Sequence, residues 1–165
     1  MNFRESAQPF IENSSGSQKE LPSSNVFGVK DICKIQTLHR GSKSIIDKVY
    51  SERNEKTYIK KTFLYNKKKP SLYFLNEIRF SNLSHPNVIS PIYYEIDVKG
   101  TRENPFRSST IFMEYAPNGD FFELLMSKRI KFDDKLIRTF FQQLINGLEF
   151  LHSNGVAHMD IKMEN

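Results

Sequence analysis

The sequence lacks the features of several protein classes. It contains a single cysteine, Cys33, and no tryptophan. One cysteine cannot form a disulfide within the chain, so we expect an intracellular, cytoplasmic protein in which Cys33 is a buried, unreactive thiol. No apolar run approaches the ~20 residues needed to cross a bilayer. The first residues have no apolar signal core. We therefore expect neither a membrane protein nor a secreted one.

The sequence also lacks a strong excess of charge of one sign. The 24 Lys and Arg against 19 Asp and Glu give a formal net charge of +5, which suits an anionic ligand. The basic residues are scattered apart from Lys67-Lys68-Lys69. Such a run usually lies in a solvated loop, and a nucleic-acid-binding role has only this run and the net charge to support it. We expect no nucleic-acid partner.

The composition changes near residue 27. Residues 1–27 are rich in Ser, Asn, Gln, Glu and Pro with isolated apolar residues, which predicts a disordered tail. Residues 28–165 have enough apolar residues for a core, and their number suits one ordinary domain.

The apolar pattern of this region predicts strands first and helices later. Alternation predicts half-buried strands, and spacings of three and four predict helices. One helix is expected from Ser71 to about His85, a short one over 120–126, and a long one from cap candidates Asp133 or Asp134 to His152. The strands are expected at 32–38, 44–50 and 57–63, in part of 88–98, and at 110–115.

Three short motifs carry a resemblance. They are Met113-Glu114-Tyr115, Asn118-Gly119-Asp120 and the block from His158 to Asn165. The last resembles the kinase catalytic loop, His-Arg-Asp with an Asn five residues after the Asp, and Asp160 and Asn165 keep that spacing. With the order of elements, the chain from about Phe27 onward resembles eukaryotic protein kinases of the Ser/Thr type.

The resemblance implies a protein-kinase-like α+β fold. Residues 28–116 would form the five-stranded antiparallel small lobe with one helix, and residues 117–165 the first helices of a helical large lobe. The sequence stops before the Asp-Phe-Gly magnesium site of the family. We therefore expect an incomplete catalytic domain that is inactive by itself.

The family's catalytic-loop roles fall on three residues. Asp160 would accept the proton of the substrate hydroxyl, Lys162 would neutralise charge on the transferred phosphate, and Asn165 would bind Mg²⁺. An Asp in a loop is often only a turn or cap residue. The presence of Lys162 and Asn165 nearby favours the catalytic interpretation.

The resemblance also implies an ion pair that anchors the phosphates of ATP. Lys61 is the candidate lysine, with Lys60 as its competitor, and Glu77 is its expected partner. On a strand, Lys61 shares a face with Ile59, which would stand where a small residue usually meets adenine. A Glu77 that faces solvent is the alternative.

In the hinge, the resemblance places Met113 as the residue that gates the pocket behind adenine. The carbonyl of Glu114 and the N–H of Ala116 would bind the adenine edge, and Asp120 would lie near the ribose. A plain buried edge strand is the alternative interpretation of residues 111–115, and the two interpretations are compatible.

The glycine-rich loop of the family, Gly-x-Gly-x-x-Gly-x-Val, is poorly matched. The best overlay uses His39, Gly41, Ser44 and Ile46, so only Gly41 is retained. A second overlay ends at Lys48-Val49-Tyr50 and also lacks the third glycine. Glycine lets backbone N–H groups approach phosphate closely, so this departure weakens the case for tight ATP binding.

The resemblance thus implies an ATP-dependent protein Ser/Thr kinase that uses ATP and Mg²⁺ and acts on a protein substrate. Lys162 is typical of the Ser/Thr branch. Met159 replaces an arginine that pairs with activation-loop phosphate in many kinases. The alternatives are a pseudokinase or regulatory binding fragment and, less well supported, a nucleic-acid-binding protein.

Overall fold

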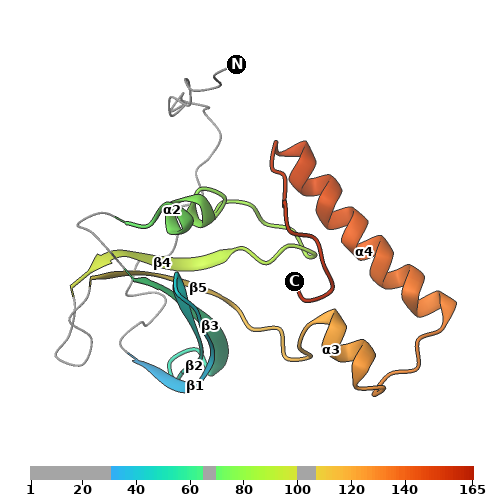
Figure 1. Ribbon diagram of the computed structural model, residues 1–165, viewed down its shortest axis with the longest axis horizontal. Coiled ribbons are helices and arrows are strands. Elements are labelled where there is room, and N and C mark those ends of the chain that lie inside the picture. The colour runs from blue at the N-terminus through green and yellow to red at the C-terminus, as the bar shows by residue number, and fades with distance from the viewer. Residues whose placement is uncertain (1–30, 65–69, 100–106) are drawn as a thin grey trace.

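A computed structural model describes residues 31–64, 70–99 and 107–165 (Figure 1). The tail predicted for residues 1–27 and the run Lys67–Lys69 lie outside the described residues. Figure 1 shows a sheet with one helix against it, followed by two helices and a C-terminal segment on the other side of the molecule.

The sheet has the predicted strands in the predicted order. In the described part of the chain, five antiparallel strands are arranged β1-β2-β3-β5-β4. The β2–β3 and β3–β5 pairs run in continuous register, whereas the β1–β2 and β4–β5 pairs each contain two register shifts. The central strand β3 is therefore the most regularly held. The strands are β1 (Ile32–Arg40), β2 (Ser44–Ser51), β3 (Lys56–Leu64), β4 (Pro91–Val98) and β5 (Ser108–Glu114).

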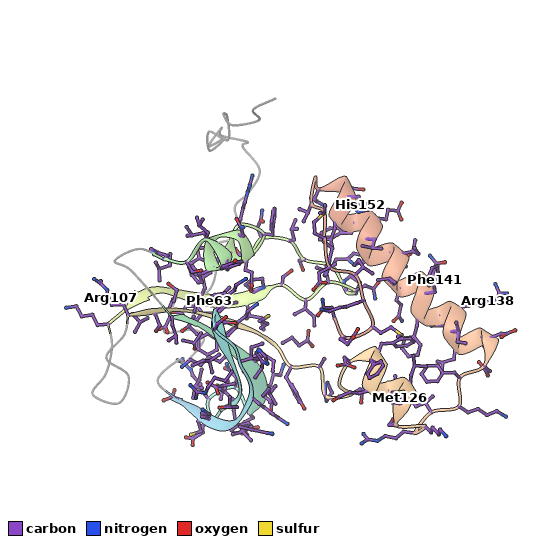
Figure 2. The ribbon with its side chains drawn as sticks, viewed as in Figure 1. Phe63, Arg107, Met126, Arg138, Phe141 and His152 are labelled. Carbon is purple, nitrogen blue, oxygen red and sulfur yellow. The ribbon has the colours of Figure 1, made fainter. Side chains whose placement is uncertain are left out.

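Both faces of the sheet carry apolar clusters. On one face Phe63 and Ile111 pack with Phe74 of helix α2 (Leu72–Ile78), and all three are almost fully buried. Figure 2 labels Phe63 at the sheet near α2. The opposite face carries a second cluster, formed by Val49, Tyr58, Tyr93 and Phe112.

Helix α2 is shorter than predicted. The side chain of Ser71 accepts a hydrogen bond from the N–H of Tyr73, so the predicted N-cap is confirmed. The α-helix ends at Ile78 rather than near His85. Beyond it Ser81 N–H donates to the carbonyl of Ile78, a bond three residues long that tightens the chain into turns.

Two helices follow the sheet, α3 (Phe121–Met126) and α4 (Asp134–Ser153). Asp133 is the N-cap of α4, because its Oδ1 accepts a hydrogen bond from Leu136 N–H at 2.8 Å. The rings of Phe121, Phe132 and Phe140 lie 5.2–6.2 Å apart and pack α3 against α4.

The predicted apolar stripe of α4 is buried only in part. Leu151 is buried, whereas Phe141 is 62% exposed and lies on α4 away from the sheet (Figure 2). Across the described ranges, no helix combines the length and apolar character required to cross a membrane.

The expectation that Cys33 is buried is wrong. Its side chain is exposed, because β1 is an edge strand whose residues are exposed on both faces apart from half-buried Ile32 and Thr37. The thiol donates a hydrogen bond to Glu52 at 3.3 Å, and this carboxylate raises the pKa of Cys33. Alternation in the sequence indicated a half-buried strand, but it cannot show which strand lies at an edge.

Gly147 lets α4 approach the loop that follows α2. It is buried, and a Cβ built on it would lie 2.8 Å from the carbonyl oxygen of Asn87. Nearby, the His85 ring stacks on Phe150 of α4 at 4.8 Å between centroids. These two contacts join the sheet side of the molecule to α4.

We expect Gly147→Ala to lower the free energy of unfolding by about 1–2 kcal/mol, because the overpacking cost exceeds the gain in helix propensity. Denaturant unfolding of the natural protein measures this change. Glu149→Ala, at an exposed position on the same helix, is the control and should change stability little. A Gly147→Ala protein more stable than the parent would contradict the close contact.

Candidate active site

Strand β3 and helix α2 bring the predicted lysine and glutamate together. Lys61 Nζ lies 2.5 Å from Glu77 Oε1, and both side chains are half-buried. Lys61 is paired with Ile46 on β2 and with Ile111 on β5, so both of its neighbouring strands fix its position. The alternative of a solvent-facing Glu77 is therefore wrong.

The competitor Lys60 lies on the other face of the sheet. Neighbouring residues on a strand point to opposite sides, and Lys60 Nζ lies 5.9 Å from the centroid of Phe112, a member of the opposite cluster. Among the two lysines, only Lys61 is placed against α2.

The second part of the site is the loop that follows α4. The amide nitrogen of Asn165 donates to Asp160 Oδ2 at 2.7 Å and to the Asp160 carbonyl at 2.9 Å. Lys162 Nζ lies 3.2 Å from the same carboxylate oxygen. The three predicted catalytic-loop residues thus form one cluster.

The contacts of Asp160 favour its ionised form. The hydrogen bond from Asn165, followed by that from Lys162, holds the pKa of Asp160 below its usual range. An ionised carboxylate accepts hydrogen bonds and can take up a proton from a group positioned next to it. Asp160 can therefore orient a hydroxyl group at neutral pH.

Asn165 suits the predicted cation site in one respect. Both of its partners on Asp160 are acceptors, so the NH₂ group of the amide must face them. The amide oxygen of Asn165 is then directed elsewhere, and an oxygen of this kind is a suitable Mg²⁺ ligand.

The first residues of helix α3 hydrogen-bond the loop that contains Asp160 and Asn165. The N–H groups of Phe121 and Phe122 donate to the carbonyl of Met163 at 3.0 and 3.2 Å. Figure 1 shows the C-terminal segment returning from the end of α4 toward α3. Within the loop, Met159 has a positive φ of 64°, an uncommon conformation for a non-glycine residue that often marks functional sites.

The predicted hinge residues follow the end of β5. Met113 is half-buried and packs against the cluster of Phe63, Phe74 and Ile111. Glu114 ends β5, and Ala116 is exposed just beyond it.

Asp120, expected near the ribose, is also the N-cap of α3. Its Oδ1 caps α3 by accepting a hydrogen bond from Glu123 N–H at 2.7 Å. One carboxylate oxygen therefore has a structural role that the sequence analysis did not assign.

The turn between β1 and β2 holds the one glycine that matches the family loop. Gly41 N–H donates to the carbonyl of Ser44 at 2.9 Å. A Cβ on Gly41 would meet the flexible ring of His39 at 2.9 Å, so its need for glycine is modest. The pairing of Ile46 with Lys61, and the burial of Val49 in the opposite cluster, favour the overlay on Gly41 over the one that ends at residues 48–50.

Two contacts of the site were missed by the sequence analysis. Lys48 Nζ donates to the hydroxyl of Tyr115 at 3.1 Å. Lys43 Nζ, at the β1–β2 turn, lies 4.2 Å from the ring centroid of Tyr73 on α2. Neither has a signal in the sequence, because the partners are distant along the chain and no fixed spacing relates them.

Comparison with known proteins decides the family. The family model described as the protein kinase domain matches residues 33–165. The chain belongs to the protein kinase family. The five-stranded sheet with its helix is accordingly the small lobe of a kinase domain, and α3 and α4 are helices of the large lobe.

The similar proteins are kinases by name, and the first of them is named a serine/threonine-protein kinase. The chain is 28% identical over 164 residues to serine/threonine-protein kinase PKH2 of Saccharomyces cerevisiae, across 97% of the chain and 14% of that protein. It is 39% identical over 83 residues to MAP kinase kinase kinase SSK2 of the same yeast, across 50% of the chain and 5% of that protein. Over 95 residues it is 34% identical to NUAK family SNF1-like kinase 2 of Rattus norvegicus, across 57% of the chain and 14% of that protein. The chain thus spans only a small part of the length of each of these relatives.

Proposed function

We propose that the natural protein transfers the γ-phosphoryl group of ATP to Ser or Thr hydroxyls of a protein substrate. The observation that carries this proposal is the presence of both halves of the site, the Lys61–Glu77 ion pair and the Asp160–Lys162–Asn165 cluster. Relatives named serine/threonine-protein kinases support the substrate class.

The residues have separate roles in this proposal. Lys61, aimed by Glu77, binds the phosphates of ATP, and Asp160 orients the substrate hydroxyl and accepts its proton. Lys162 offsets charge on the phosphoryl group in transfer. Asn165 would hold Mg²⁺, which would neutralise phosphate charge, and Met113, Glu114, Ala116 and Asp120 would contact the nucleoside.

A binding module without catalytic activity is the second candidate. It is favoured by the β1–β2 turn, where a single glycine remains and the N–H of Gly41 is engaged by Ser44. A backbone N–H that is already paired contributes nothing to phosphate binding, so this loop would hold ATP less firmly than the loop of the family.

Phosphoryl transfer from radiolabelled ATP to generic protein substrates, with Mg²⁺ and the natural full-length protein, separates the two candidates. We expect transfer, with phosphoserine and phosphothreonine as the labelled products, since Lys162 occupies the position typical of the Ser/Thr branch. Predominant phosphotyrosine would contradict the substrate class. ATP binding without transfer would instead establish the binding module.

A further inference from the structure

Lys48, on strand β2, contacts Tyr115 in the hinge that follows β5. Lys48 Nζ donates to the Tyr115 hydroxyl at 3.1 Å and lies 4.2 Å from the centroid of the same ring. The two residues are 67 positions apart, and both are half-buried. One ammonium group thus holds the ring by its hydroxyl and by its face.

The sheet register places this contact on the nucleotide side. Lys48 is paired with Ile59, and Ile59 is paired with Met113. Paired residues of antiparallel strands project to the same face, and Ile59 shares its face with Lys61, two residues further along β3. The contact between Lys48 and Tyr115 therefore runs from β2 to the hinge beside Ile59, the residue expected against adenine.

Tyr115 lies between the two backbone groups expected to bind the base. Its own peptide groups connect the carbonyl of Glu114 to the N–H of Ala116, so a fixed Tyr115 side chain restricts the backbone on both sides. In the described residues, the backbone hydrogen bonds of the sheet connect β2 to β5 only by way of β3, which lies between them. The Lys48 contact adds a direct connection at the hinge.

We propose that Lys48 is a positioning residue that holds the hinge, through Tyr115, in the conformation that binds the purine base of ATP. This inference rests on the proposed function. The base is remote from the transferred phosphate, so the contact acts alike on bound ATP and on the transition state. Loss of such uniform binding raises KM and leaves kcat nearly unchanged.

The test uses the natural full-length protein and three substitutions. Lys48→Met removes the charge but keeps an unbranched apolar stem, Lys48→Arg keeps the donor and the cation, and Tyr115→Phe removes only the hydroxyl. The dissociation constant of a fluorescent ATP analogue and the KM for ATP are measured for each protein. Lys34→Met is the matched control, because Lys34 pairs with Asp47 in the same hairpin at 3.0 Å.

We expect Lys48→Met to raise both constants about tenfold, which corresponds to ~1.4 kcal/mol, with kcat within twofold of the parent. Lys48→Arg should restore values near those of the parent. Tyr115→Phe should have a smaller effect, and the double variant with Lys48→Met should be no worse than Lys48→Met alone, because both changes remove one contact.

Two outcomes would overturn the role of Lys48. One is an unchanged dissociation constant and KM in Lys48→Met, and the other is an equal change in Lys34→Met. Failure of the proposed function is seen separately. Nucleotide binding that follows the expected pattern without any phosphoryl transfer would remove the kinase activity and retain the role of Lys48. Phosphoryl transfer with an unaltered KM for ATP in Lys48→Met would retain the kinase activity and reject the role of Lys48.

Discussion

Replacing Asp160 with asparagine is expected to lower kcat for phosphoryl transfer about 100- to 10,000-fold, the range for losing a positioned general base. The carboxylate accepts hydrogen bonds from Asn165 and Lys162, which fix its position and hold the pKa of Asp160 below its usual range. An asparagine side chain at 160 is neutral and cannot take up the hydroxyl proton. Binding of ATP should change much less, since the base and phosphates contact other residues.

The measurement is transfer from radiolabelled ATP by the natural protein and its Asp160→Asn variant, with ATP binding measured in parallel. Asp133→Asn is the matched control. It makes the same chemical change at the N-cap of α4, where Asn and Asp are equally good caps. A kcat for Asp160→Asn within tenfold of the parent would exclude Asp160 as the group that orients and deprotonates the hydroxyl.

Replacing Lys61 with methionine is expected to lower kcat/KM about 100- to 1000-fold, the typical loss when one electrostatic contact to the reacting group is removed. Lys61 is fixed by Ile46 and Ile111 on its two sides and by Glu77 on α2. Glu77→Gln should also reduce kcat/KM, because a neutral amide aims the ammonium group less firmly. The double variant should be little worse than Lys61→Met, since residues that act as a unit are not additive.

Lys60→Met is the control for this series. It removes a lysine from the next position of β3, where the side chain lies over Phe112 on the opposite face. Steady-state kinetics with varied ATP give the required values. Equal losses of kcat/KM for Lys60→Met and Lys61→Met would show that the phosphate-binding lysine has been assigned to the wrong face of β3.

The parts of the fold and site that sequence patterns predicted are those with a fixed local spacing. Alternation of apolar and polar residues predicted the position of β1, and a spacing of three and four residues predicted α4. Asp160, Lys162 and Asn165 lie within six positions of one another, so their cluster in space follows from their order. The resemblance proposed Lys61 and left Lys60 as its competitor, and the contacts with Glu77 and Phe112 place the two lysines on opposite faces of β3.

The features that were missed depend on distant parts of the chain. The exposure of Cys33 follows from the position of β1 at the sheet edge, which only the strand order reveals. The end of helix α2 at Ile78 is an exception, because it is local: apolar residues continue to Leu83, but short bonds such as Ser81 N–H to the Ile78 carbonyl replace the α-helical pattern. The contact of Lys48 with Tyr115 joins residues with no regular spacing between them.

The four register shifts of the sheet all lie in the pairs made by its edge strands, β1 and β4. An edge strand offers unpaired N–H and C=O groups to any other chain, and a regular edge is a template for aggregation. Irregular pairing twists and interrupts that row of groups. The interior ladder can therefore stay regular enough to hold Lys61, while the borders of the sheet remain poor partners for strands of neighbouring molecules at high concentration.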